Sequence, residues 1–257
     1  FLDTPDFRDD ACYEGALETL VRQISEPPDP LCKLTGVPDL PPHFIRSRDR
    51  IAALKECVMA DFGHATAITG VHGTGGIGKS VLANALARDY QIRRSFPDGV
   101  VWVTVGQTPH LASLQASVSA MLGQDAFFQN AEQGKGHLRK LLEEKAVLLV
   151  LDDVWAREQA EAFDVLGPRC RAVVTTRDAS LVTGLGGVDY QVQLMSDAEA
   201  RHLLAEGAGL PESGLPPSAA EVISQCGRMP VAVSICGAMV RDGSTWEDIV
   251  SALAEAD

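Results

Sequence analysis

The spacing of apolar residues changes along the chain, and the change separates two kinds of structure. Between residues 66 and 194, short valine-rich runs alternate with stretches of helical spacing, such as 81–88 and 110–122. This alternation is typical of βαβ units, and an unbroken apolar run is typical of a strand buried on both faces of a parallel sheet. The strands that the pattern predicts are 66–71, 99–105, 146–151, 172–176 and 188–194. We therefore predict an α/β fold, a parallel sheet between two layers of helices.

Beyond residue 195 the strand pattern stops, while helical spacing continues to the end of the chain. The predicted helices are 196–207, 217–226, 230–242 and 245–255. Two earlier helices are expected. The first, at 12–24, must end at the proline-rich segment that follows it, and the second lies at about 48–60. We therefore divide the chain into an N-terminal leader or linker at 1–35, an α/β domain at 36–194 and a small all-helical domain at 195–257.

Composition narrows the class of protein. A hydrophobic content of 46% and a charged content of 22% are those of a soluble globular chain. The net charge of −13 disfavours a broad nucleic-acid or anionic-membrane surface, with a local basic site as the alternative. No apolar stretch approaches the ~18 residues of a membrane span. The six cysteines form no C-x-x-C pair, which favours buried thiols and a cytoplasmic location. The chain begins at Phe1 without methionine, so we expect it to be a fragment.

The segment 73–80 carries the most specific motif. It reads Gly-Thr-Gly-Gly-Ile-Gly-Lys-Ser, a full match to the phosphate loop G-x-x-x-x-G-K-[ST], and it lies between a predicted strand and a predicted helix. The glycines let successive backbone N–H groups point at a phosphate chain, and the helix N-terminus adds partial positive charge. Lys79 would reach the β- and γ-phosphates, and the Ser80 hydroxyl would bind Mg²⁺. The expected phosphate contacts are Gly73, Gly75, Gly76, Ile77, Gly78, Lys79, Ser80 and Val81.

This context predicts a P-loop NTPase fold and favours it over the alternative, a glycine-rich turn that matches by chance. A second motif supports it, because the apolar run 147–151 ends in two carboxylates, Asp152 and Asp153. Asp152 fits a Mg²⁺ ligand, and Asp153 would face the γ-phosphate and orient an attacking water. Standing alone, such a pair would indicate an ordinary helix cap or turn. The chain lacks the Asn-Lys-x-Asp motif with which GTPases bind guanine, and the signature of ABC transporters, so adenine is the expected base.

Taken together, several segments resemble the NB-ARC branch of the STAND signalling ATPases, the nucleotide switch of plant resistance proteins and of the animal apoptotic protease-activating factor. The resemblance covers about residues 40–257. The matching segments, in family order, are Phe44–Arg48, Val71–Leu82, Phe96–Val105, Leu148–Trp155, Val173–Asp178 and Gly227–Pro230.

The resemblance implies further site residues. Arg177 is similar to the family's sensor of the γ-phosphate, although a surface arginine paired with an acid is the alternative. Pro230 is similar to the residue whose ring packs on adenine, although a proline that opens a helix is ordinary punctuation. Ile45 and Arg48 occupy the stretch that touches adenine in the family. With Lys79 and Asp153, Arg177 completes the expected catalytic set.

The resemblance also implies a function. ADP would hold a closed monomer, and exchange for ATP with Mg²⁺ would permit self-association that clusters an N-terminal effector in cell-death or defence signalling, with at most slow ATP hydrolysis. A turnover ATPase or phosphotransferase, and the ATPase core of a transcription regulator, are the alternatives. The family continues into a winged-helix domain and a repeat sensor, which are expected beyond Asp257. Residues 1–30 resemble the tail of a TIR-type effector domain, and a helical leader is an equal alternative.

Overall fold

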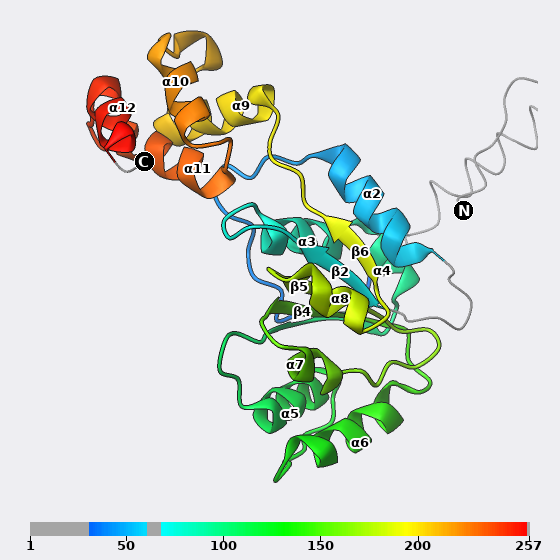
Figure 1. Cartoon of the computed structure of the whole chain (residues 1–257). Coiled ribbons are helices and arrows are strands. Elements are labelled where there is room, and N and C mark those ends of the chain that lie inside the picture. The colour runs from blue at the N-terminus through cyan, green and yellow to red at the C-terminus, as the bar shows by residue number, and fades with distance from the viewer. Residues whose placement is uncertain (1–30, 61–67, 256–257) are drawn as a thin grey trace, which may run out of the picture. The chain divides into compact units, whose positions relative to one another are not determined.

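A six-stranded, wholly parallel sheet organises the first part of the chain (Figure 1). The structure is a computed structural model that describes residues 31–60 and 68–255. The strands lie in the order β1-β3-β4-β5-β2-β6. Their bounds are β1 Leu34–Thr35, β2 Ile68–His72, β3 Gly99–Thr104, β4 Val147–Val154, β5 Arg171–Thr176 and β6 Val188–Gln191. Strand β5 therefore lies between β2, which leads into the phosphate loop, and β4, which carries the acid pair.

Helices cover both faces of this sheet, as the sequence predicts. Alternate residues of β4 enter different cores: Leu148 and Val150 pack with helices α2 to α4, whereas Leu149 and Leu151 pack with α5 to α8. This alternation is the reason for an unbroken apolar run, because both faces of the strand are buried. The helices are α2 Arg48–Met59, α3 Lys79–Ala87, α4 Tyr90–Ser95, α5 Leu111–Met121, α6 Ala131–Leu142, α7 Arg157–Glu161 and α8 Ala179–Gly184.

The last part of the chain is helical and has its own core of buried residues, from Met195 to Ile249. Its elements are α9 Asp197–Ala208, a 3₁₀ turn at Glu212–Gly214, α10 Ser218–Gln225, α11 Pro230–Arg241 and α12 Trp246–Ala254. Helices α9 and α11 cross closely, because a Cβ atom on Gly237 would lie 3.0 Å from the Cα atom of Gly207. A side chain at either position would push the two backbones apart by a few tenths of an ångström, so glycine favours this approach.

The described helices and strands differ from the predicted ones at a few places. Helices α4, α6, α7 and α8 and strand β1 have no predicted counterpart, and the strand expected at 188–194 ends at Gln191. Because β1 pairs with β3, the expected leader boundary at residue 35 falls at the end of a strand of the sheet. Contacts join Cys32–Asp257 into a single unit, so the division near residue 195 stays a prediction. The helix expected at 12–24 lies outside the described residues.

Candidate nucleotide-binding site

The phosphate loop connects β2 to the N-terminus of α3. Three of its glycines have positive φ angles: 154° at Gly73, 81° at Gly76 and 99° at Gly78, which caps α3. A side chain would strain the backbone in these conformations, so the glycine spacing follows from the curl of the loop. The loop therefore presents backbone N–H groups at the start of a nine-residue helix, the arrangement that binds anions.

Lys79, the first residue of α3, folds back over the loop. Its Nζ donates to the carbonyl oxygen of Gly73 at 2.8 Å and to that of Thr74 at 2.9 Å. Burial lowers the pKa of Lys79 and the nearby charge of Arg177 lowers it further, while Asp153 and Asp152 act in the opposite direction. Four predicted site residues thus interact electrostatically, although they come from three separate strand ends.

The two carboxylates at the end of β4 are held by a threonine of β5. The Thr175 hydroxyl donates to Oδ1 of Asp152 at 2.6 Å and accepts the backbone N–H of Asp153 at 2.8 Å. Asp152 is only 8% exposed, and Asp153 has a φ of 59° at an irregularity in the β4–β5 pairing. This strained backbone turns Asp153 away from the regular strand, and such outliers gather at functional sites. Thr175 is a site residue that sequence reasoning did not single out, although it lies in the matching Thr-Thr-Arg segment.

Arg177 follows β5 directly and lies against the loop. Its Cζ and Nη1 atoms are 3.3 Å from the position that a Cβ atom on Gly75 would take. The same Cζ lies 4.7 Å from the ring centroid of Trp155, within the range of a cation–π contact. The guanidinium is therefore beside the loop, where a terminal phosphate of a bound triphosphate would be expected.

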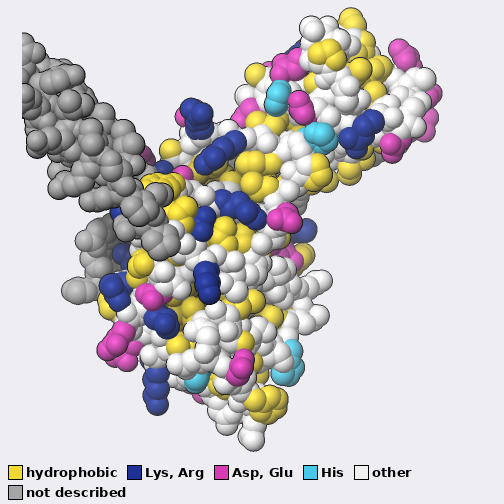
Figure 2. Space-filling view, turned by 180° about the vertical axis from the view of Figure 1, so that it is seen from behind, with side chains coloured by type: hydrophobic (Ala, Val, Ile, Leu, Met, Phe, Trp, Pro, Cys, Tyr) yellow, Lys and Arg dark blue, Asp and Glu magenta, His cyan; other side chains and the backbone are white. Residues whose placement is uncertain are grey.

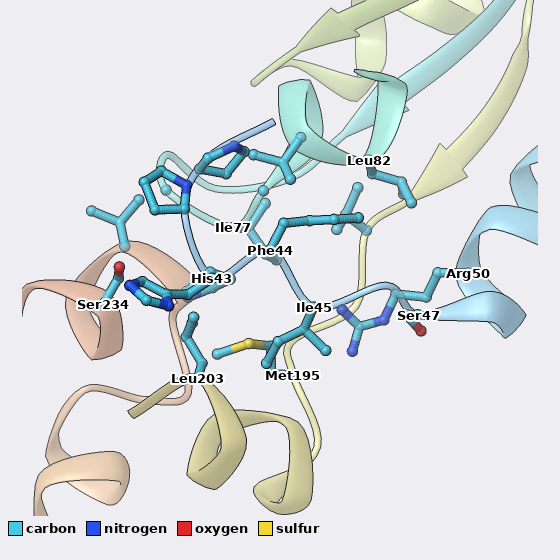
Figure 3. A pocket seen from close by; sticks show the side chains of 18 of the residues that line it. His43, Phe44, Ile45, Ser47, Arg50, Ile77, Leu82, Met195, Leu203 and Ser234 are labelled. Carbon is cyan, nitrogen blue, oxygen red and sulfur yellow. The ribbon is translucent and has the colours of Figure 1, made fainter. Parts of the chain in front are cut away.

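An apolar cavity of about 230 Å³ adjoins the loop (Figure 3). Figure 3 shows His43, Phe44 and Ile45 on one segment that crosses the cavity, with Leu203 and Ser234 on helices of the last part of the chain. The lining residues are Pro41, Pro42, His43, Phe44, Ile45, Ser47, Arg50, Ile51, Gly76, Ile77, Gly78, Val81, Leu82, Val192, Met195, Leu203, Pro230, Val231 and Ser234. The loop and the cavity thus form one continuous candidate site that both parts of the chain line.

Of the three residues predicted to contact the base, two line the cavity and one does not. Ile45 and Pro230 line the cavity, and Pro230 opens α11 with its Cγ 3.9 Å from the position of a Cβ atom on Gly78. Arg48 is exposed and is not among the lining residues. Arg50 lines the cavity instead, because it lies about half a turn further along α2. Its guanidinium donates to Oε2 of Glu199 at 2.5 Å and to the carbonyl oxygen of Leu194 at 3.2 Å.

The residue types of the predicted metal site suit a divalent cation. Ser80 supplies a hydroxyl and Asp152 a carboxylate, the oxygen ligands that Mg²⁺ prefers when it also binds phosphate. Within the described residues, His, Cys, Asp and Glu side chains form no group of three that could hold a metal by themselves. Any metal here would therefore depend on the phosphates of the ligand, and the pair Ser80 and Asp152 stays a prediction.

The described surface is mixed in character. Figure 2 shows basic, acidic and apolar side chains interspersed over one face of the molecule. No helix within residues 31–60 and 68–255 combines the length and the apolar character needed to cross a bilayer.

Comparisons with known proteins agree with this geometry. The family model of the NB-ARC domain matches residues 48–212. Apoptotic protease-activating factor 1 of Homo sapiens is 34% identical over 227 residues, which cover 82% of this chain and 18% of that protein. A probable disease resistance protein of Arabidopsis thaliana is 30% identical over 198 residues, 74% of this chain and 23% of its own length. This chain therefore spans about a fifth of the relatives that it matches.

A solved structure supports the fold alone. A STAND protein with a tetratricopeptide repeat sensor from Pyrococcus horikoshii superposes with a TM-score of 0.58 at 14% identity, over 90% of this chain and 34% of that one. The predicted fold class, a parallel P-loop sheet followed by a helical segment, is confirmed.

Proposed function

The chain belongs to the NB-ARC domain family, and we propose that it is the adenine-nucleotide switch of a larger signalling protein. The observation that carries the proposal is the continuity of the site. Lys79, Asp153 and Arg177 converge at the phosphate loop, and the apolar cavity that begins at Gly76 and Gly78 ends on helices α9 and α11. A nucleotide that fills both would connect the sheet to the helical segment.

In this proposal the loop holds the phosphates. Backbone N–H groups of residues 73–80 and the Lys79 ammonium bind them, and Ser80 with Asp152 holds Mg²⁺. The metal would neutralise phosphate charge. Asp153 would orient the water that attacks the γ-phosphate, and Arg177 would bind that phosphate and so distinguish ATP from ADP.

The cavity would take the base. Its walls are predominantly apolar, and the rings of Pro230, Pro42 and Phe44 offer flat surfaces beside Ile45. An adenine ring that packs there is removed from water, which favours binding through its apolar faces. We assign adenine because the chain lacks the guanine-binding motif of GTPases.

The output of the whole protein follows from its relatives only as part of this proposal. The names of the human and Arabidopsis relatives indicate cell-death and disease-resistance signalling. We propose that ADP keeps the intact protein closed, that ATP permits it to self-associate, and that effector and sensor parts lie in the sequence outside this chain. A slow hydrolysis of ATP would reset the switch.

The nucleotide that the protein carries tests the proposal. The chain is purified without added nucleotide and extracted with acid, and the extract is compared with nucleotide standards by ion-exchange chromatography. We expect mostly ADP, because a ligand enclosed by two parts of a protein leaves slowly. A guanine nucleotide would contradict the adenine assignment. If extraction yields none, an ADP titration by calorimetry decides, and an absence of binding rejects the proposal.

A steady-state ATPase assay separates a switch from a turnover enzyme or phosphotransferase. A kcat far below ~1 s⁻¹, the lower end for enzymes, supports the switch. A kcat within or above the enzyme range would mean that hydrolysis is the output, and the switch would be wrong.

A further inference from the structure

Arg177 is an exposed arginine whose guanidinium lies against the phosphate loop. A long side chain at the surface has many rotamers available, and fixing it costs conformational entropy. Here the guanidinium has two close neighbours: its Cζ lies 4.7 Å from the indole centroid of Trp155, and it lies 3.3 Å from the position that a Cβ atom on Gly75 would take. Tryptophan provides the strongest cation–π contact of the aromatic side chains. Such a contact offers a specific reason for the observed position.

The charged neighbours of Arg177 include a second cation, Lys79. The charge of Arg177 acts unfavourably on Lys79, so with no phosphate between them the two cations repel each other. Asp153 and Asp152 act on Lys79 in the opposite direction. An exposed arginine could move away from Lys79 by turning toward water. The indole ring opposes that movement because it attracts the guanidinium. Since the indole carries no charge, the positive charge of Arg177 remains available to a phosphate.

Trp155 is itself held in place by a buried glutamine. Gln159 is 7% exposed, and its Oε1 accepts the backbone N–H of Trp155 at 2.8 Å. The Nε2 of Gln159 donates to the carbonyl oxygens of Gly106 at 3.2 Å and Gln107 at 3.3 Å, just beyond β3. The backbone that carries the indole is therefore tied to a neighbouring strand end. Trp155 is 39% exposed, but these hydrogen bonds fix the backbone from which its side chain extends.

We infer that Trp155 is a positioning residue for Arg177, which holds the guanidinium against the phosphate loop so that the site distinguishes a nucleoside triphosphate from a diphosphate. The inference rests on the proposed function, since it needs Arg177 to bind the terminal phosphate. Preorganisation of this kind improves affinity, because the ligand does not have to order the side chain when it binds. Gly75 contributes by lacking a side chain at the place where the guanidinium lies.

The test is a comparison of ATP and ADP affinities, measured by calorimetry with Mg²⁺ on the whole chain. We expect Trp155→Ala to weaken ATP about two- to fivefold, the scale of an exposed cation–π contact, and to leave ADP unchanged. Trp155→Phe should lose less, because phenylalanine keeps an aromatic face. In an Arg177→Ala background, Trp155→Ala should have no further effect on ATP, since the group that it positions is gone.

Tyr90→Ala is the matched control. It removes the aromatic partner of a second arginine, Arg94, whose Cζ lies 5.8 Å from the Tyr90 ring centroid on α4. We expect this variant to bind both nucleotides like the wild type. Thermal melting of each variant verifies folding, and Trp155→Phe provides the test if Trp155→Ala does not fold.

The possible failures can be told apart. If Trp155→Ala weakens ATP and ADP equally, leaves both unchanged, or weakens ATP as much without Arg177 as with it, the positioning role is wrong while the proposed function stands. If Arg177→Ala leaves the ATP-to-ADP ratio of affinities unchanged, the sensor role and the positioning role both fail. If the wild-type chain binds neither nucleotide, the proposed function fails and the inference with it.

Discussion

The phosphate loop and the apolar cavity, the two ends of the candidate site, are built in opposite ways. The charged groups around the loop lie at the carboxyl end of β4, just after β5, or on the helix that follows β2. These three strands are neighbours, so their carboxyl ends lie at one edge of the sheet. The cavity is lined by side chains from segments far apart in the sequence, around residues 41–51, 76–82, 192–203 and 230–234. One end therefore belongs to the rigid sheet, and the other is shared with the helical segment.

This difference indicates which end of the site could change during switching. Two hydrogen bonds with the Thr175 hydroxyl, one accepted and one donated, fix the acid pair to β5, so the phosphate end should keep its geometry whether or not the helices move. The cavity closes only while α9 and α11 remain near the loop. We therefore expect variants at the phosphate end to affect phosphate binding and hydrolysis, and variants at the cavity to affect only ligands that carry a base.

The largest expected effect concerns hydrolysis, which depends on the phosphate end alone. Asp153→Asn keeps the size of the side chain but removes the charge that would orient water. We expect the single-turnover rate of ATP hydrolysis to fall by about 10²- to 10⁴-fold, the contribution of a general base, with ATP affinity nearly unchanged. Rapid-quench measurements provide the rate. Asp164→Asn, at an exposed position, should behave like the wild type, and a loss of ATP binding in Asp153→Asn would contradict the assigned role.

Lys79→Ala should remove binding of every ligand that carries phosphates. Its ammonium would contact two phosphates, and hydrogen bonds to charged groups contribute about 1.5–3 kcal/mol each, so ATP, ADP and inorganic tripolyphosphate should all weaken by at least ~100-fold. Calorimetry measures the three affinities, while far-UV circular dichroism should stay native. Lys140→Ala on α6 is the control, and an unchanged tripolyphosphate affinity in Lys79→Ala would reject the loop assignment.

Arg177→Ala tests whether the phosphate end distinguishes a triphosphate from a diphosphate. Only a triphosphate offers a γ-phosphate within its reach, so ATP should weaken by ~1–3 kcal/mol, the scale of a hydrogen bond to a charged group, and ADP should not. Competition against a fluorescent nucleotide gives both values. Arg139→Ala, an exposed arginine of α6, should change neither. An equal loss for ATP and ADP would identify Arg177 as a structural residue.

The same contrast explains how much of the site the sequence could predict. The phosphate end comes from contiguous motifs, so Lys79, Asp152 and Asp153 could be predicted from spacing, and Arg177 from family resemblance. The cavity depends on how distant segments pack, which no local pattern records. Arg48 illustrates the limit: it was predicted from the resemblance, whereas Arg50, about half a turn further along α2, is the arginine of this helix that lines the cavity.

The fold was predicted well where periodicity is long and poorly where it is short or interrupted. Strand β1 has two residues and α4 has six, too few for a pattern to repeat. Helix α6 contains two glycines, which oppose a helix prediction. One of them, Gly134, is required by packing, because a Cβ atom there would lie 2.1 Å from Oε1 of the buried Gln115. A tertiary contact thus overrides the local propensity.

Filling the cavity should separate its role from that of the loop. Ser234→Trp places a large ring on the α11 wall, and overpacking of this kind costs about 1–3 kcal/mol, so ATP and ADP should weaken roughly tenfold while tripolyphosphate keeps its wild-type affinity. Calorimetry again gives the three values. Ser224→Trp, at an exposed position of α10, is the matched control. If the affinity for tripolyphosphate falls as much as that for ATP, the phosphate loop and the cavity do not act independently.

The smallest expected effect tests the ion pair between Arg50 of the cavity wall and Glu199 of α9. Burial alone would raise the pKa of Glu199, but hydrogen bonds from the Ser196 backbone and hydroxyl, with the Arg50 charge and the Ser47 hydroxyl, outweigh it and lower that pKa. A carboxylate with a lowered pKa stabilises the folded state fully above its ordinary pKa of 4.5 and loses that contribution as the pH falls through the lowered value.

Glu199→Gln isolates the charge, because glutamine can still bond back to the Ser196 N–H in the capping box of α9. We expect the free energy of unfolding to fall by about 0.5–1 kcal/mol at neutral pH, as for a partly exposed ion pair, and the difference from the wild type to shrink as the pH drops below 4.5. Urea denaturation at the two pH values measures it. Glu161→Gln breaks an exposed pair with Arg157 and should show a smaller loss. A Glu199→Gln deficit that persists unchanged in acid would mean that the carboxylate charge does not connect the helices to the cavity wall.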